Sequence, residues 1–236
     1  MGRVPSLITD GILSKGQRKE RNWKGTKFNM PYAKAIETFR REVAGRPDFD
    51  PATLLVWGTY MAKTVLQIME DVEENFGSEG QKVASEAMTK VGHDVAEQMF
   101  QGTKFPAGTT DIEKVSFATT WVNTVTWSSI ERPQILNSEE AIFDILWCPH
   151  QDTYKPFDCR VQRYLVEGIL KYLREKIDPN FDFEFKWTIP AGAETCRFRI
   201  WRRKKGDEGQ WEKHSQLLAQ RATRRWESKR PRKRIE

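Results

Sequence analysis

The sequence is poor in cysteine and histidine, with three residues of each in a chain of 236. Three cysteines are too few, and odd in number, for the disulfide framework of a small secreted domain. The chain also lacks an apolar run of the roughly 18 residues that a membrane-spanning helix needs, and its first residues show no secretion signal. These absences predict a soluble, cytoplasmic protein with reduced thiols and no membrane partner.

Motifs that mark common catalytic and nucleotide-binding sites are absent as well. The chain contains no GxGxxG, GxxxxGK[ST], HExxH, GxSxG or CxxC pattern, so nucleotide-binding, zinc-protease and serine-hydrolase sites have no local support. Hydrophobic residues make up 38% of the chain and charged residues 31%, which is ordinary for one globular domain. The nine tryptophans suit either the walls of a pocket or plain core packing.

Charge is distributed unevenly along the chain. Residues 1–27 carry 7 basic and 2 acidic residues, and residues 202–236 carry 13 and 5, whereas residues 28–201 carry 19 and 26. The net charge of +6 therefore hides an acidic middle between two basic ends. This division predicts a basic N-terminal arm over 1–27, a single domain over 28–201 and a solvated basic tail over 202–236.

Three helices are predicted in the first hundred residues. Residues 31–45 form a short amphipathic pattern that stops at Gly45. Asp50 and Pro51 then open a long helix that reaches Gly77, and a second long helix follows it directly. A single glycine between two long helices predicts an antiparallel helical hairpin. Acidic residues late in the first long helix oppose the helix dipole and indicate cationic neighbours: Glu70, Asp71, Glu73 and Glu74.

The composition changes after residue 110 toward β-branched and aromatic residues. Residues 114–127 are predicted to form one long or two short strands, because their large apolar side chains share one parity. A strand over 139–148, a helix over 159–176 and a hairpin over 181–203 follow. Helices that precede strands predict an α+β fold. We expect a long helical hairpin packed on a twisted antiparallel sheet, with one helix inserted before a C-terminal β-hairpin.

The cysteines are the main candidates for chemistry. Cys148 follows a predicted strand, Cys159 opens a predicted helix and Cys196 lies in the final hairpin, with His150 near the first. Three thiolates, or two with an imidazole, can bind zinc or another divalent metal if the fold brings them together. Cys159 can instead be a nucleophile, because a helix N-terminus lowers the pKa of a thiol. Cysteine that only fills the core is the third interpretation, and the spacing leaves all three open.

Histidine and acidic side chains offer fewer candidates. His150 is the best acid–base candidate because it lies in a loop between two cysteines. His93 is expected to pack on a helix, and His214 to be solvated in the tail. A pair of carboxylates could activate water, and four acidic residues are candidates for such a pair: Asp144, Asp152, Asp158 and Glu167.

The basic tail has eight Lys and Arg residues between positions 221 and 234, with Trp226 among them. Cations around an aromatic side chain can bind single-stranded nucleic acid, yet no nucleic-acid-binding motif accompanies them. We therefore expect a solvated tail, or one that contacts an acidic protein surface, and no nucleic-acid partner.

Three stretches resemble one family in their order along the chain. They are FGSEGQKVASEAMTKVGHDVAEQM, ILWCPHQDTYKPFDCRVQRYLVEGILKYL and AGAETCRFRI. Their pattern is similar to that of the L-2-amino-thiazoline-4-carboxylic acid hydrolase-like family and of the related 4-vinyl-reductase sensor domains. Two positions differ from that pattern. Gln162 stands where an acidic residue often follows the second cysteine, and Ala193 stands where an acid follows Gly192.

The resemblance implies a helical hairpin on a twisted antiparallel sheet, often in a dimer, with a small-molecule pocket between helices and sheet. In the hydrolase branch the reaction opens a thiazoline ring, so we expect hydrolysis of a cyclic C–N bond. In the sensor branch the domain binds an aromatic ligand, and cysteines can hold zinc. The matching positions are Cys148, Cys159 and Cys196. The alternative is a non-catalytic ligand-sensing or subunit-scaffolding module whose basic tail binds a partner.

Overall fold

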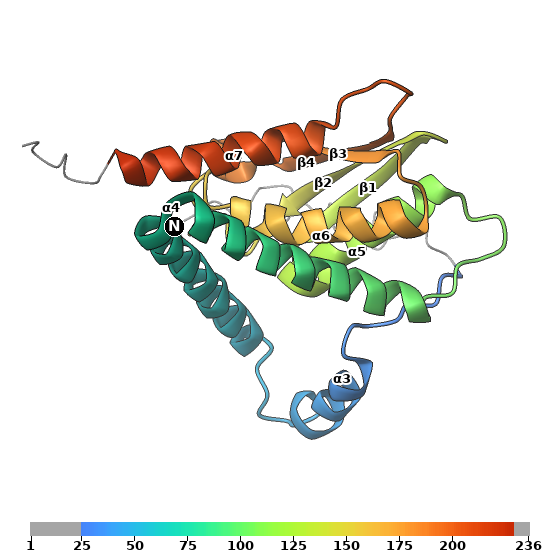
Figure 1. Cartoon of the computed structure of the whole chain (residues 1–236). Helices are drawn as coiled ribbons and strands as arrows, with labels where there is room; N and C mark the ends of the chain where they lie inside the picture. The colour runs from blue at the N-terminus through green and yellow to red at the C-terminus, as the bar shows by residue number, and fades with distance from the viewer. Residues whose placement is uncertain (1–24, 229–236) are drawn as a thin grey trace, which may run out of the picture.

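The structure, a computed structural model, describes residues 25–228 (Figure 1). Its elements are α3 (Ala33–Phe39), the π-helical turn η1 (Arg40–Ala44), α4 (Ala52–Gly102), α5 (Asp111–Trp127), β1 (Ile130–Asn137), β2 (Glu140–Trp147), α6 (Arg160–Lys176), β3 (Phe181–Trp187), the 3₁₀ turn η2 (Ile189–Ala191), β4 (Cys196–Arg202) and α7 (Gln210–Glu227). The predicted α+β fold is confirmed. Within residues 25–228 no helix combines the length and the apolar character needed to cross a membrane.

The strands form one antiparallel sheet in the order β1-β2-β4-β3. Alternate side chains on the strands point to one face, and the aromatic residues of the three last strands meet there. Phe143 of β2 is paired with Phe198 of β4, which is paired in turn with Phe185 of β3. The ring centroids are 4.4 Å apart in the first pair and 4.0 Å in the second. This aromatic row forms the floor of the core.

Helices α5 and α6 cover the apolar face of the sheet, and α4 packs on α6 (Figure 1). Helix α6 is strongly amphipathic, and its buried positions recur at helical spacing. Its apolar side, with Ile169, Leu170 and Leu173, joins the core cluster on the sheet, while Val161 and Tyr164 pack with Met69 of α4. The inserted helix is therefore the central layer of the domain.

Helix α4 bends sharply at Gly77, as the sequence predicted (Figure 1). Gly77 has φ 63° and ψ −136°, a conformation that costs glycine little and other residues much more. The arm before the bend contains residues 52–76 and the arm after it residues 78–102. The second arm lies along α6, whereas the beginning of the first arm runs away from the sheet (Figure 1).

The prediction of strands over 114–127 is wrong, because this segment is helix α5. A capping box opens the helix, in which the Glu113 carboxylate accepts hydrogen bonds from the Thr110 N–H and hydroxyl, both at 2.7 Å. Most of its residues are buried on several sides of the helix. A helix buried all round has no apolar stripe, so its sequence looks like that of a buried strand.

The expectation of a solvated tail is also wrong for the part that the structure describes. Helix α7 packs along β3 and α4, and two of its tryptophans are almost fully buried, Trp211 at 1% exposure and Trp226 at 5%. The basic residues after position 228 lie outside the described residues, as does most of the arm 1–27. The boundaries 1–27, 28–201 and 202–236 stay a prediction.

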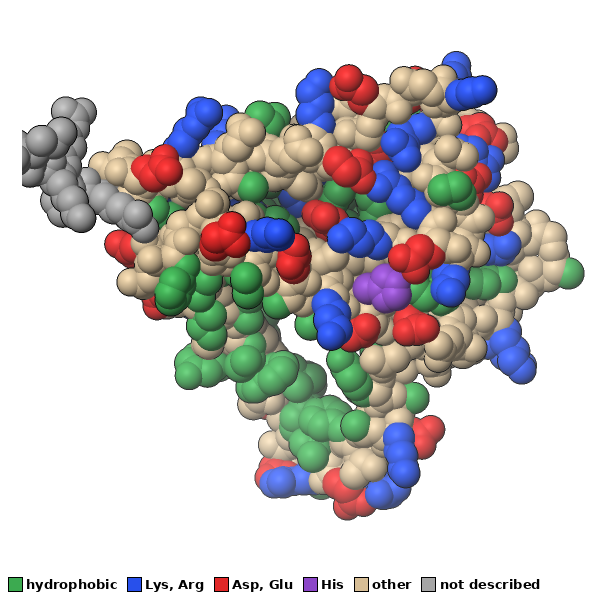
Figure 2. Space-filling model, in the orientation of Figure 1, with side chains coloured by type: hydrophobic (Ala, Val, Ile, Leu, Met, Phe, Trp, Pro, Cys, Tyr) green, Lys and Arg blue, Asp and Glu red, His purple; other side chains and the backbone are tan. Residues whose placement is uncertain are grey.

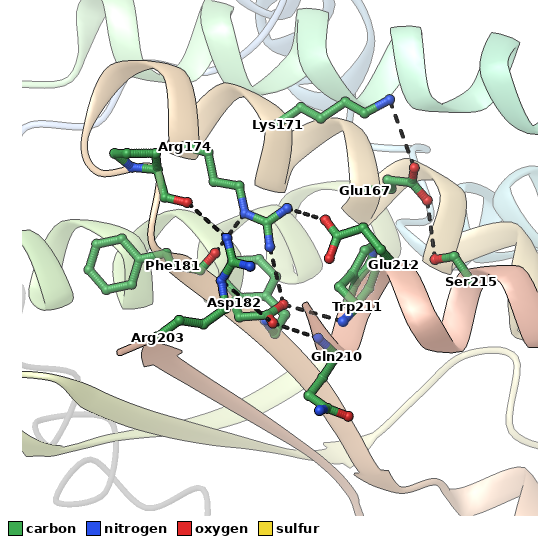
Figure 3. A network of polar contacts seen from close by, with 12 residues as sticks. Glu167, Lys171, Arg174, Phe181, Asp182, Arg203, Gln210, Trp211, Glu212 and Ser215 are labelled. Carbon is green, nitrogen blue, oxygen red and sulfur yellow. Dashed lines mark hydrogen bonds and ion pairs between the residues drawn. The ribbon is translucent and has the colours of Figure 1, made fainter. Parts of the chain in front are cut away.

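A carboxylate on β3 fixes the beginning of α7 (Figure 3). Asp182 is fully buried. It accepts hydrogen bonds from the Gln210 and Trp211 backbone N–H groups at 2.8 and 3.3 Å, and it also forms an ion pair with the Arg174 guanidinium of α6 at 3.2 Å. An acid at a helix N-terminus satisfies free N–H groups and complements the helix dipole. Asp182 thus joins α7 to the sheet and to α6.

The cationic neighbours expected for the acidic end of the first α4 arm are present. Glu73 is buried and forms an ion pair with Arg160 of α6 at 2.8 Å. Its carboxylate also accepts a hydrogen bond from the Trp226 indole N–H at 3.3 Å. Glu70 pairs with Arg225 of α7 at 3.1 Å. The acidic turn of α4 is therefore where α4, α6 and α7 meet.

Candidate functional site

The three cysteines line one cavity, which lies between α6, the end of α5 and the sheet. Cys148 follows β2, Cys159 precedes the first residue of α6 and Cys196 begins β4. The cavity has a volume of about 50 Å³. Its walls are mainly apolar, and they include Trp127, Ile145, Val166, Phe185 and Phe198. The tertiary structure thus gathers three cysteines that are up to 48 positions apart in the sequence.

Cys159 is the N-cap residue of α6, as predicted, but its thiol is not activated. Burial raises the pKa of Cys159 to about 12, and the nearby thiols of Cys196 and Cys148 add to the rise. The helix N-terminus would lower this pKa, and desolvation of a thiolate in an apolar cavity outweighs that effect. At neutral pH Cys159 is a protonated thiol.

The other two thiols are also protonated in this environment. Burial raises the pKa of Cys196 to about 12, and the Ile189 N–H donates a hydrogen bond to its sulfur at 3.2 Å. Burial raises the pKa of Cys148 as well, while hydrogen bonds from the His150 and Gln151 backbone N–H groups oppose that rise. Cys148 therefore has the most hydrogen-bond donors directed at its sulfur.

His150 lies in the turn after Cys148 and is 5% exposed. Its ring stacks on Tyr154 with a centroid distance of 4.8 Å, and burial lowers its pKa. The imidazole is therefore neutral at pH 7, so it can accept a proton. Its Nδ1 atom is buried without a hydrogen-bond partner among the described residues. A buried polar atom of this kind is uncommon and is often found where a ligand binds.

Gln162 follows Cys159 by three positions and lies on the same side of α6 as the cavity. Its Oε1 atom is buried and has no hydrogen-bond partner among residues 25–228. The Gln162 side chain does bond to the Tyr154 hydroxyl, whose pKa burial raises to about 12. The sequence identified Gln162 only as a departure from a family pattern. Its place in the cavity was not predicted.

The geometry does not provide a metal site. In the part of the chain that the structure describes, no three His, Cys, Asp or Glu side chains are grouped so that they could hold a metal ion. Cys148, Cys159, Cys196 and His150 share a cavity, but they do not form a ligand set. The zinc or other divalent metal remains a prediction that the geometry does not support, and no chemical step is assigned to it.

The other candidates from the sequence lie elsewhere. None of the acidic residues Asp144, Asp152, Asp158 and Glu167 lines the cavity. Asp144 pairs with Arg197 at 2.6 Å, and Asp158 accepts a hydrogen bond from the Lys155 N–H at 2.9 Å. His93 contacts Glu175 of α6 at 3.2 Å. Of the nine tryptophans, Trp127 alone is among the described residues that line the cavity.

The fold and the site together define an α+β domain with a buried, thiol-lined cavity between its central helix and its sheet. The family model of the L-2-amino-thiazoline-4-carboxylic acid hydrolases matches residues 58–200, and the chain belongs to this family. The match begins inside α4 and ends in β4, so it includes the whole cavity and leaves out α7. The family resemblance of the sequence is confirmed, whereas the link to 4-vinyl-reductase sensor domains stays a prediction.

A curated relative is similar to nearly the whole chain. An uncharacterized protein of Archaeoglobus fulgidus is 46% identical over 211 residues, which is 87% of this chain and 93% of that protein. The similarity therefore extends well beyond the family match, to nearly the full length of both proteins. No solved structure matches the chain.

Proposed function

We propose that the chain binds a small cyclic molecule in the thiol-lined cavity and hydrolyses a ring C–N bond. The observation that carries this proposal is the convergence of Cys159, His150 and Gln162 on one cavity in a member of a ring-opening hydrolase family. A nucleophile, a neutral base and a hydrogen-bonding amide are the groups that such a reaction needs.

In this proposal Cys159 attacks the ring carbon that lies between nitrogen and sulfur. His150 accepts the thiol proton and passes it to the ring nitrogen, which leaves as an amine when the C–N bond breaks. Water then releases the thiol-linked product and restores the Cys159 thiol. The overall reaction consumes one water molecule and needs no oxidant or reductant.

The test is turnover of 2-amino-2-thiazoline and of its 4-carboxylate by the full chain. Cleavage of the C–N bond adds one water and yields an S-carbamoyl amine, whereas cleavage of the C–S bond yields a urea with a free thiol. Mass spectrometry detects the gain of one water in the product. A thiol reagent then distinguishes the products of C–N and C–S cleavage. We expect a product without a new thiol. If neither ring gains water, the chain is not a thiazoline hydrolase.

Replacement of Cys159 with serine is expected to lower kcat/KM at least about 100-fold, because a serine hydroxyl is a much weaker nucleophile. Because His150 takes the thiol proton and burial lowers its pKa, while the Cys159 pKa of about 12 keeps the thiol protonated, the rate should be nearly constant between pH 7 and 9 and should fall in acid, where His150 becomes protonated. Val91→Thr, an exposed change on α4, is the control for the variant. An unchanged rate in Cys159→Ser would leave Cys159 a packing residue.

A second candidate function, subunit scaffolding, is favoured by one surface. The first turns of α4 expose large apolar side chains around the helix, and Figure 2 shows apolar atoms gathered along this arm. They are Leu54, Leu55, Val56, Trp57, Tyr60 and Met61, of which Val56, Trp57 and Tyr60 are 65–70% exposed. A helix that is apolar all round is normally buried, and an exposed apolar patch marks an interaction site. We propose that this arm contacts a second copy of the chain.

Light scattering of the purified chain tests this contact. We expect a mass above the 27.6 kDa of one chain, and we expect the double substitution Trp57→Glu and Tyr60→Glu to restore that monomer mass, because charges are not tolerated in a desolvated contact. Val83→Glu, on the second arm and 63% exposed, is the control. A wild-type chain of monomer mass would contradict the proposal.

A further inference from the structure

The thiol-lined cavity is uncharged. None of the described residues that line it is Asp, Glu, Lys or Arg. Its titratable groups are held in their neutral forms as well: burial raises the pKa of the thiols and of Tyr154, and lowers the pKa of His150. A charged ligand inside the cavity would therefore lose its hydration and find no ion-pair partner, which is strongly unfavourable.

Two hydrogen-bonding atoms in the wall are left for a ligand to satisfy. They are Nδ1 of His150 and Oε1 of Gln162, both buried and without partners within residues 25–228. The amide oxygen can only accept, so its complement is an N–H group. The imidazole nitrogen accepts or donates according to its tautomer. The surrounding walls are aromatic and aliphatic, which suits the faces of a flat ring.

The size of the cavity sets a further limit. A cavity needs about 10–15 Å³ to hold one water molecule. The cavity volume of about 50 Å³ therefore has room for roughly three to five waters. A single five-membered ring with one small substituent is near that limit. A carboxylate on the same ring adds three heavy atoms as well as a charge.

From these three features we infer that the cavity selects an uncharged five-membered nitrogen heterocycle with an N–H donor and excludes its carboxylated form. The inference builds on the proposed function, since it names the class of ring that the same cavity would accept. It departs from the carboxylated compound that gives the family its name. The physical reason is that residues 25–228 provide no cation in the cavity and have the amide Gln162 where an acid is frequent.

The experiment compares 2-aminothiazole with 2-aminothiazole-4-carboxylate by titration calorimetry at pH 8 on the full chain. Both rings are aromatic and resist hydrolysis, so each gives an equilibrium Kd. We expect the neutral ring to bind at least tenfold more tightly. Equal or tighter binding of the carboxylate would overturn the inference, as would no binding of the neutral ring at millimolar concentration.

Two variants locate the selectivity in the cavity. Gln162→Leu removes the amide acceptor and should weaken binding of the neutral ring about tenfold, while Gln162→Lys adds a cation and should bring the two Kd values together or reverse their order. Lys171→Gln changes charge on the exposed side of α6 and should alter neither Kd. If Gln162→Leu binds the neutral ring as tightly as the wild type does, the ring binds outside this cavity. If Gln162→Lys does not fold, the Kd of Gln162→Leu alone tests whether the ring binds at Gln162.

The outcome is separable from that of the proposed hydrolysis. Turnover of the thiazoline carboxylate together with tight binding of the carboxylated thiazole would refute the neutral-ring selectivity and leave the hydrolase proposal standing. Tight binding of the neutral thiazole without turnover of either thiazoline would refute hydrolysis and leave the selectivity standing.

Discussion

Replacing Trp211 with alanine is expected to lower the free energy of unfolding by about 3–5 kcal/mol, the range for truncation of a buried tryptophan. Trp211 begins α7 and is 1% exposed. The Arg163 guanidinium lies 3.8 Å above its ring, and Phe185 packs on it with a centroid distance of 5.6 Å. Its carbonyl accepts a hydrogen bond from Arg163 at 2.7 Å. Loss of the ring would therefore loosen α7 from both β3 and α6.

Urea unfolding followed by circular dichroism measures this effect, and thermal melting should show a fall of roughly 6–20 °C for a domain of this size. Trp187→Ala is the matched control, because Trp187 is 44% exposed and its removal should cost less than about 1 kcal/mol. If Trp211→Ala is as stable as the wild type, α7 contributes nothing to the domain and the solvated-tail interpretation is restored.

Replacing Gly168 with alanine is expected to destabilise the domain by at least about 3 kcal/mol, at the upper end of the cost of overpacking. A Cβ atom at Gly168 of α6 would lie 1.9 Å from the Thr89 carbonyl oxygen of α4 and 2.5 Å from the His93 backbone nitrogen. At Gly92 of α4, a Cβ atom would lie 1.9 Å from the Leu165 carbonyl oxygen. The two backbones touch at this crossing, so neither helix can yield by rotating a side chain.

The control for this prediction is another glycine in α4. A Cβ atom at Gly58 has no atom within 4 Å, and alanine is the better helix former, so Gly58→Ala should stabilise the domain by up to about 1 kcal/mol. Chemical unfolding of both variants gives the comparison. A Gly168→Ala protein as stable as Gly58→Ala would show that α4 and α6 are farther apart than the structure places them.

Most of the fold could be predicted because the segments concerned carry one clear periodicity. The residues of β4 alternate between buried and partly buried, and the apolar residues of α6 recur at helical spacing. Segments that are buried on several sides were predicted wrongly, as in α5, which was predicted to form strands. The capping box formed by Thr110 and Glu113 was a local signal for the helix there.

Helix α7 was mistaken for a different reason. Charged residues are prominent in its sequence, whereas its packing in the fold depends on a narrow apolar stripe. That stripe has helical spacing in the sequence: Trp211, Leu218, Ala222 and Trp226. A hydrophobic period was therefore present among the basic residues. The fold uses this stripe to cover β3 and the acidic turn of α4.

The sequence by itself determined the α+β class, the bend at Gly77, the inserted helix with Cys159 at its N-cap and the family. These properties depend on local patterns, which the chain carries residue by residue. Only the tertiary structure decided that the three cysteines line one cavity, that the described residues around it carry no Asp, Glu, Lys or Arg, and that Gln162 and His150 each have a buried atom there without a partner among those residues. Burial and distance between remote segments set those properties, and the burial that gathers the thiols also raises their pKa values.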